Sequence, residues 1–159
     1  MATAAAHGQT SANAVQVAIR AAAFVTPSLS GPITVAIVYE AGDPGSEKEA
    51  RDIERAMSGG LHVGSVTLSA RRVASSSLDQ MAGARIAFVT KGTSYRQIAA
   101  ATAARSILSI SFDPACAGGG YCVLSVTEEP RIQIIVSKAA AAAAKLKFNS
   151  SFLMLVKEV

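Results

Sequence analysis

Half of the 159 residues are apolar, only 5% are aromatic and 16% are charged. A chain of this length can bury a hydrophobic core, and its composition excludes both a disordered chain and a coiled coil. The formal net charge of +4 comes from scattered basic residues, with Arg71-Arg72 as the only adjacent pair, so we expect no nucleic-acid partner.

Residues 1–10 are small and polar and predict a flexible tail. They lack the basic segment and apolar core of a signal peptide, and are similar to the mature terminus of an exported protein behind an added Met. Ser11 is a candidate N-cap for a helix that ends by Pro27. The chain contains no apolar run of about 20 residues, the length that a membrane-spanning helix requires.

Residues 33–39 form a continuous run of apolar and β-branched residues, which is typical of a strand buried on both faces. Helical and strand-like segments then alternate along the chain. The further strands are predicted at residues 62–73, 85–89 and 106–112, and the helices from Ser46 as N-cap to about Gly59-Gly60, from Ser77 to Met81, and from Thr93 or Ser94 to Ala103.

The alternation of helices and strands is interrupted after residue 120. The apolar runs 121–126 and 131–136 are too close together for a helical crossover and predict an antiparallel hairpin. An Ala-rich helix is expected over 137–145, followed by a last apolar segment, 152–156. The fold class is therefore α/β, a three-layer sandwich with a mostly parallel sheet and a C-terminal hairpin, in a single domain over residues 11–159.

Polar residues follow several of the predicted parallel strands. Ligands of open α/β sheets gather beyond the carboxyl ends of the strands. An anion could bind the helix start at Thr93-Ser94 with the help of Lys91, although simple capping by these hydroxyls is the favoured alternative. The candidate ligand-binding residues are Glu40, Lys91, Thr93, Ser94 and Asp113.

Recognisable catalytic and metal-binding patterns are missing from the sequence. The turn Gly42-Asp-Pro-Gly-Ser46 lacks the Lys of a phosphate-binding loop, and no Gly-x-Ser-x-Gly motif occurs. His7 and His62 have no further ligands at metal-binding spacing. We therefore expect a binding or regulatory protein, not an enzyme, with neither a metal nor a cofactor.

The two cysteines, Cys116 and Cys122, bracket a loop with three glycines. Their spacing does not fit a redox Cys-x-x-Cys motif or a zinc knuckle. They are either two free thiols or a disulfide, and the even count and the flexible loop favour the disulfide. A disulfide would imply an oxidising compartment.

The C-terminal half resembles the YfiR-like family. The resemblance rests on the Cys-bracketed glycine loop of residues 116–122 leading into the hairpin, on the Ala-rich helix from Ser137, and on the ending Lys147-Phe-Asn-Ser-Ser-Phe-Leu-Met-Leu-Val156. It implies a periplasmic protein shaped like half of a periplasmic binding protein, with Cys116 and Cys122 at the position of one family disulfide.

The resemblance also implies a function. The best-known member of the family restrains a membrane-bound diguanylate cyclase in a redox-sensitive way, which affects cyclic-di-GMP signalling and biofilm behaviour. The expected partner is thus the extracytoplasmic domain of a membrane signalling protein, contacted through apolar residues such as Phe148, Phe152 and Leu153 where these are not core. The alternative is a single-domain solute-binding protein for a small metabolite or anion. A homodimer is compatible with either function.

Overall fold

A computed structural model describes residues 11–58, 61–63 and 66–159, with the backbone alone for 61–63. The chain folds around one eight-stranded sheet, and a separate two-stranded ladder joins β1 (Val25–Thr26) to β9 (Lys147–Phe148). The strands of the large sheet are β2 (Gly31–Tyr39), β3 (Leu61–Val63), β4 (Val66–Ala74), β5 (Ala84–Val89), β6 (Leu108–Ser111), β7 (Leu124–Thr127), β8 (Gln133–Val136) and β10 (Lys157–Glu158).

The strand order is β10-β8-β7-β6-β5-β2-β4-β3. From β4 through β2, β5 and β6 to β7 every neighbouring pair is parallel. Strands β7 and β8 form the antiparallel hairpin, and β10 returns parallel to β8. The predicted α/β class, with a mostly parallel sheet and a C-terminal hairpin, is confirmed.

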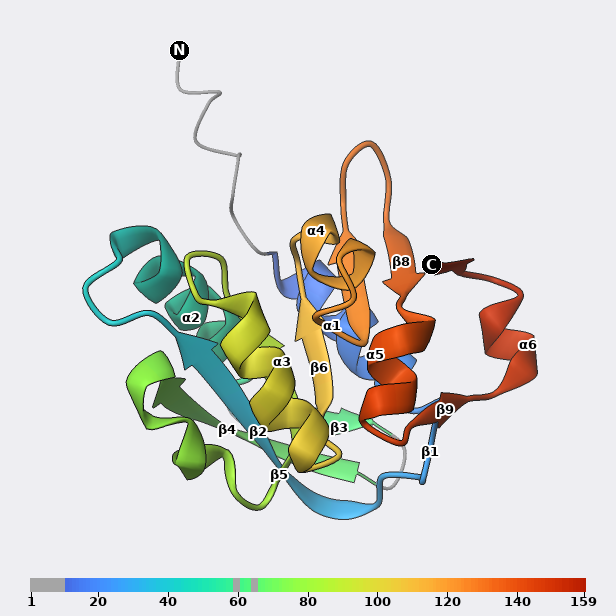
Figure 1. Cartoon of the computed structure of the whole chain (residues 1–159), viewed down its shortest axis with the longest axis horizontal. Coiled ribbons are helices and arrows are strands. Elements are labelled where there is room, and N and C mark those ends of the chain that lie inside the picture. The colour runs from blue at the N-terminus through green and yellow to red at the C-terminus, as the bar shows by residue number, and fades with distance from the viewer. Residues whose placement is uncertain (1–10, 59–60, 64–65) are drawn as a thin grey trace.

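Helices cover both faces of this sheet, as a parallel sheet requires. Helices α1 and α2 lie behind it in Figure 1, while α3 and α5 lie in front. The helical segments are α1 (Ala12–Ala22), α2 (Pro44–Ala56), the 3₁₀ segment η2 (Ser75–Met81), α3 (Tyr95–Ala104), α4 (Pro114–Gly118), α5 (Lys138–Ala143) and α6 (Ser150–Leu153).

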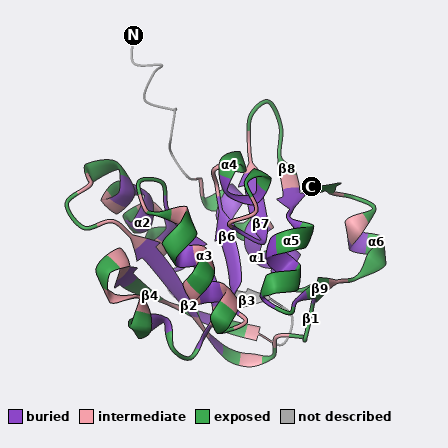
Figure 2. Ribbon diagram, viewed as in Figure 1, coloured by how far each residue is buried: buried purple, intermediate pink, exposed green. Residues whose placement is uncertain are grey.

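Alternation along the central strand β2 divides the core into two layers. Val35 and Ile37 pack on the side of α1 and α2, whereas Ala36 and Val38 face the side of η2 and α3. All four are fully buried, and the buried residues of Figure 2 accordingly concentrate along the strands. Because successive side chains of a strand point to opposite faces, a continuous apolar run is what a sheet covered on both sides needs.

The start of α2 differs from the prediction. Asp43, not Ser46, is the N-cap: its side chain accepts a hydrogen bond from the Ser46 backbone N–H, and Pro44 begins the helix. Proline suits the first helical position because its missing N–H would have no partner there. The predicted end at Gly59-Gly60 lies outside the described residues, and α2 itself ends at Ala56.

The single strand predicted over residues 62–73 is wrong. The chain instead forms an antiparallel pair, with Leu61–Val63 in β3 and Val66–Ala74 in β4. Partial alternation does not distinguish one long strand from two short ones that pair with each other. β4 pairs with β2 along nine residues, and β3 forms the edge of the sheet beyond it.

Two short helices near the C-terminal end were not predicted. Helix α4 begins after Asp113-Pro114, with the same Asp N-cap and Pro start as α2. Helix α6 is a single turn that buries Phe152 and ends before Leu155, which is 85% exposed. Across the described residues no helix combines the length and the apolarity needed to cross a bilayer.

Candidate functional site

The carboxyl ends of β2, β4, β5 and β6 carry a set of polar residues, here called the carboxyl edge. Glu40 follows β2, Ser75 follows β4, Thr90 and Lys91 follow β5, and Asp113 lies two residues after β6. Because β4, β2, β5 and β6 are adjacent and parallel, these residues reach the same side of the sheet. This is the position at which open α/β sheets place their ligands.

A directed chain of hydrogen bonds occupies the centre of the carboxyl edge. Thr90 Oγ1 donates to the Val38 carbonyl at 2.8 Å, so the 2.7 Å bond between Thr90 Oγ1 and Ser46 Oγ takes its proton from Ser46. Ser46 Oγ in turn accepts from the Glu40 backbone N–H at 2.8 Å. Ser46 and Thr90 are buried, and their hydroxyls are thus committed to the protein itself.

Two carboxylates flank this chain and are also engaged internally. Glu40 Oε1 accepts from Ser75 Oγ at 2.7 Å. Glu49, on α2 and only 5% exposed, accepts from the Lys91 backbone N–H at 2.9 Å. A buried carboxylate is costly without such donors, so both bonds stabilise the packing of α2 and η2 against the strand ends.

The loop after β5 depends on a glycine. Gly92 has φ +92°, and a Cβ at this position would lie 2.5 Å from Asp43 Oδ2. Asp43 is fixed there because its other carboxylate oxygen caps α2. The close approach of the β5 loop to the start of α2 therefore requires a residue without a side chain.

Tyr95 and Asp113 form the second part of the carboxyl edge. The Tyr95 hydroxyl donates to Asp113 Oδ2 at 2.7 Å, and Asp113 Oδ1 accepts from the Ala115 N–H at the start of α4. Burial raises the pKa of Tyr95 well above its ordinary value, and the hydrogen bond and charge of Asp113 and the charge of Glu49 act in the same direction. Tyr95 is thus held as a neutral hydrogen-bond donor.

The five predicted ligand-binding residues divide into engaged and free groups. Glu40 and Asp113 accept the bonds just described, the Thr93 hydroxyl donates to the Thr90 carbonyl at 2.8 Å, and Ser94 caps α3. The Lys91 side chain is exposed. Capping by Ser94 decides between the two expected N-caps, while ligand binding by the set stays a prediction.

Sequence reasoning missed three residues that organise this edge, namely Ser46, Glu49 and Thr90. The pairs Asp43-Pro44 and Asp113-Pro114 were usable signals, because an Asp followed by Pro is a helix start. The bond between Ser46 and Thr90, which are 44 residues apart, left no signal in the sequence. Among the described residues no three His, Cys, Asp or Glu side chains come together as a metal site.

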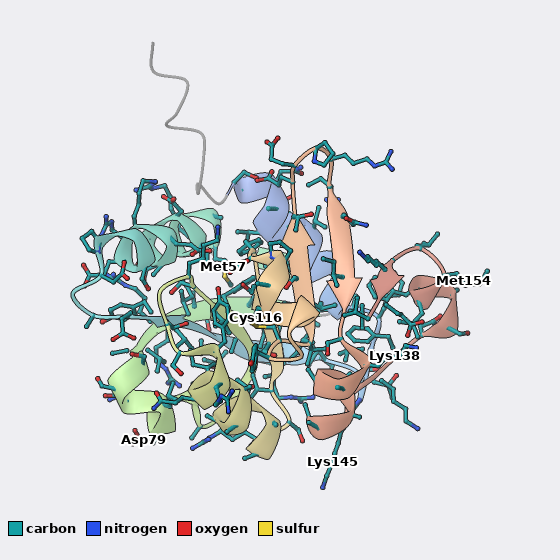
Figure 3. The ribbon with its side chains drawn as sticks, turned by 45° about the horizontal axis from the view of Figure 1, so that its top comes forward. Met57, Asp79, Cys116, Lys138, Lys145 and Met154 are labelled. Carbon is teal, nitrogen blue, oxygen red and sulfur yellow. A yellow bond between two sulfur atoms is a disulfide. The ribbon has the colours of Figure 1, made fainter. Side chains whose placement is uncertain are left out.

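The disulfide between Cys116 and Cys122 is present, with 5.1 Å between the Cα atoms. Both cysteines are fully buried, and Cys116 lies inside the fold in Figure 3. The loop between them is further closed by Tyr121 and Cys122, whose N–H groups both donate to the Cys116 carbonyl. A disulfide is consistent with an extracytoplasmic protein.

Residues 149–159, here called the C-terminal arm, cross the β8 side of the sheet. Phe152 stacks on Phe24 with ring centroids 4.9 Å apart and contacts Phe148 at 5.3 Å.

Two hollows flank the arm. One, of about 550 Å³, is lined by Pro130, Arg131, Ile132, Gln133, Ile134, Met154, Leu155, Val156 and Lys157. The other, of about 630 Å³, is lined by Val136, Lys138, Ala141, Ala142, Lys145, Leu146, Lys147, Phe148, Leu153 and Glu158.

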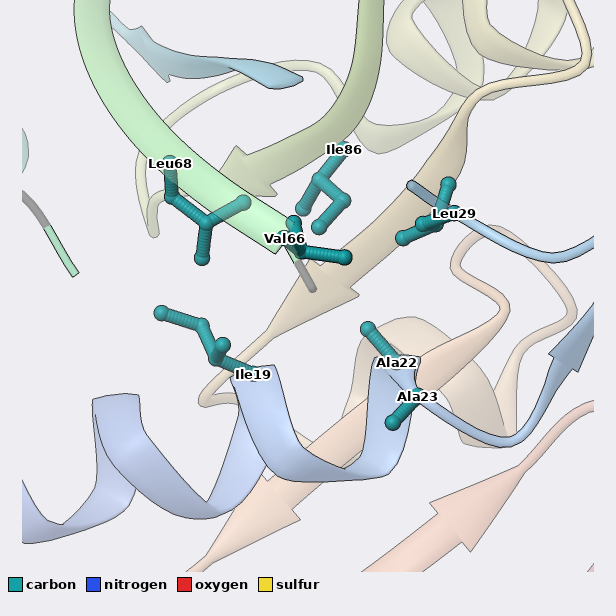
Figure 4. A pocket seen from close by; sticks show the side chains of 7 residues that line it. All are labelled: Ile19, Ala22, Ala23, Leu29, Val66, Leu68 and Ile86. Atoms are coloured by element: carbon teal, nitrogen blue, oxygen red, sulfur yellow. The ribbon is translucent and has the colours of Figure 1, made fainter. Parts of the chain in front are cut away.

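A third, much smaller cavity lies within the core (Figure 4). Side chains from α1, β4 and β5, together with Leu29, surround about 20 Å³ of space. That volume holds about one water molecule, and the lining is apolar. We regard this cavity as a packing defect, not as a ligand site.

The fold defines the structural class, an α/β domain similar in fold to one lobe of a periplasmic binding protein. A conserved domain protein from Vibrio cholerae O1 biovar El Tor has a TM-score of 0.66 and 9% identity, covering 91% of this chain and 59% of that one. The ABC domain from Streptococcus pneumonia in complex with L-Trp has a TM-score of 0.62 and 12% identity. The match covers 92% of this chain and 60% of that one.

A ligand-free, open substrate-binding protein with adhesive properties from Clostridium difficile also has a TM-score of 0.62, at 10% identity, covering 80% of this chain and 54% of that one. The chain therefore spans no more than 60% of the length of these solved structures. No curated protein matches the sequence. The chain belongs to the YfiR/HmsC-like family, which matches residues 27–157. That family is known for periplasmic regulators and is regulatory, not catalytic.

Proposed function

We propose that this protein is a periplasmic regulator that binds the extracytoplasmic domain of a membrane signalling protein, such as a diguanylate cyclase. The observation that carries the proposal is membership of the YfiR/HmsC-like family over residues 27–157. The buried disulfide supports it, because structural disulfides persist in oxidising compartments.

The carboxyl edge supports a binding function without catalysis. Catalysis needs a nucleophile or a general base within reach of a substrate. The hydroxyls of Ser46, Thr90 and Thr93 are instead committed to neighbouring protein groups, and burial together with the bond to Asp113 keeps Tyr95 neutral by raising its pKa. These residues stabilise the scaffold on which a partner would dock.

The test is binding to purified extracytoplasmic domains of diguanylate cyclases from the same organism. The oxidised chain is immobilised, each domain is passed over it, and the full-length cyclase is then assayed with and without the chain. We expect at least one domain to bind and the rate of that cyclase to fall. If none binds and no membrane protein is recovered from detergent extracts, the proposal is wrong.

The partner surface was predicted to include Phe148, Phe152 and Leu153. Phe152 is buried, and Phe148 and Leu153 are half-buried against the core. The large apolar side chains that are most exposed are Met154 and Leu155, which follow α6 directly. These two are therefore better candidates for any apolar contact than the three residues chosen from the sequence.

A second candidate function is binding of a small metabolite or anion at the carboxyl edge, through Glu40, Lys91, Thr93, Ser94 and Asp113. Two of the similar structures are described as a substrate-binding protein and as a complex with L-Trp, which favours testing it. A ligand specific for the folded state must raise the melting temperature. A metabolite panel that raises it for the wild type but not for Thr93→Ala would support this function.

A further inference from the structure

Two adjacent apolar residues, here called the tip, project from the middle of the C-terminal arm, between α6 and β10. Met154 and Leu155 are each 85% exposed, about twice as much as Phe24, Ile132 or Val159, the other exposed large apolar residues described. Met154 lies at the outer end of α6 in Figure 3. Leaving two large apolar side chains in water gains nothing for the isolated fold.

Basic residues line the hollows on both sides of the arm. Met154 and Leu155 line one hollow together with Arg131 and Lys157, and the other hollow lies next to it along the arm. The two hollows beside the arm are lined by five basic residues and one acidic residue. The lining residues of the two hollows thus carry a formal charge of +4, equal to the formal net charge of the whole chain, which has 15 basic and 11 acidic residues. Across the described residues none of the ion pairs involves the five. They are Arg131, Lys138, Lys145, Lys147 and Lys157.

The tip is also held on a fixed base. Phe152 is buried between Phe24 and Phe148, and the Asn149 N–H donates to the Phe24 carbonyl. Beyond the tip, β10 pairs with β8, so the chain is anchored on both sides of Met154 and Leu155. Met154 and Leu155 could therefore leave water for an apolar environment without unfolding the arm.

We propose that the C-terminal arm adsorbs to an anionic lipid surface, with Met154 and Leu155 inserted among the lipids and the surrounding basic residues facing the headgroups. Apolar insertion combined with basic residues is the usual physical basis of peripheral membrane binding. Each Lys or Arg near an anionic surface strengthens binding roughly fivefold. The net positive charge at the tip matches such a surface.

The chemistry of the tip favours lipid over protein. Specific protein interfaces are enriched in aromatic residues, Met and Arg and depleted of Lys. Met154 fits either partner, but four of the five basic residues here are Lys. A second copy of the chain would bring like charges together, which disfavours a dimer through this surface. The inference needs no protein partner, so it stands or fails separately from the proposed function.

The experiment is co-sedimentation of the full, disulfide-bonded chain with sucrose-loaded vesicles. One set contains phosphatidylcholine alone, and the other equal parts of phosphatidylcholine and phosphatidylglycerol. We expect binding to the anionic vesicles only, with most of it lost when the salt is raised from about 0.05 M to about 0.5 M, because exposed charges are screened. Equal sedimentation with both lipids, or with neither, overturns the proposal.

Two variants test the residues. Lys147→Gln/Lys157→Gln removes one charge from each hollow, and Arg51→Gln/Arg96→Gln removes two exposed charges from α2 and α3 as the matched control. Roughly fivefold weaker binding per charge is expected for the first pair and much less for the control. Equal losses for the two pairs would mean that attraction is non-specific and would contradict the proposal.

The apolar contribution is tested by Met154→Ser/Leu155→Ser, which keeps every charge. Both positions are so exposed that the melting temperature should not change, and this is measured on the same samples. We expect binding to fall at least tenfold. If this variant sediments as well as the wild type, or if it loses a protein partner while vesicle binding is absent throughout, the tip does not bind lipid.

Discussion

The carboxyl edge and the C-terminal arm differ in whether their side chains bond within the fold or face solvent. At the carboxyl edge, polar groups from β2, α2 and β5 bond to one another, as in the chain from Glu40 through Ser46 and Thr90 to Val38. On the arm, Met154, Leu155 and the basic residues beside them have no such partners among the described residues. The first region completes the fold, and the second is available to something outside it.

The difference shows why position in the fold alone does not identify a functional site. The carboxyl edge is where ligands of open α/β sheets bind, yet here most of its donors and acceptors are already paired. An unpaired polar group is costly only when it is buried, so the exposed basic residues of the arm need no internal partner. A functional surface is therefore better sought where exposed side chains have no partner within the fold.

The largest expected effect tests whether the arm is really anchored. Phe152→Ala removes a buried ring that contacts Phe24 and Phe148, and should lower the free energy of unfolding by about 3 kcal/mol. Met154→Ala, two residues along, should change it by less than about 0.5 kcal/mol. Urea unfolding of both proteins measures the contrast, and similar values for the two would mean that the arm is not packed as described.

An intermediate effect is expected at the carboxyl edge. Ser46→Ala leaves the Glu40 N–H without its acceptor and Thr90 Oγ1 without its donor, in a buried site. The expected loss is about 2 kcal/mol. The control is Ser58→Ala, since Ser58 is exposed and bonds only to the Arg55 carbonyl among the contacts described. Urea unfolding at neutral pH compares the two, and a loss no greater than that of the control would show that the edge is not a closed network.

The smallest expected effect is a pH dependence. The folded chain raises the pKa of Tyr95 above its ordinary value of 10.0, so the fold stabilises the neutral phenol. This contribution is complete below pH 10 and is lost as the pH rises beyond it, because the unfolded chain then releases the proton more readily. The wild type should therefore lose more stability than Tyr95→Phe between about pH 8 and about pH 11.

The difference between the two proteins should stay below about 1 kcal/mol, since the half-buried ring is partly solvated. Urea unfolding at both pH values measures it, with Tyr121→Phe as a matched control on the neighbouring ring. Parallel pH profiles for the wild type and Tyr95→Phe would contradict a Tyr95 pKa that is raised in the folded chain by burial and by Asp113.

The sequence alone determined the fold class and the family resemblance, and it favoured the disulfide over two free thiols. Each depends on local information. This information consists of apolar β-branched runs such as residues 33–39, turns marked by Pro and Gly, and two cysteines separated by a flexible loop. The division of residues 62–73 into two strands was not determined, because a hairpin and a long strand share the same alternation.

Only the tertiary structure decided which polar and apolar residues are used internally. Asp113 looks available in the sequence, but the packing of α3 beside β6 brings it the hydroxyl of Tyr95, 18 residues earlier in the chain. Phe152 and Leu155 look alike as apolar residues, yet one packs between two rings and the other points into solvent. Burial depends on what the rest of the chain places around a residue, and that arrangement is not contained in any local stretch of sequence.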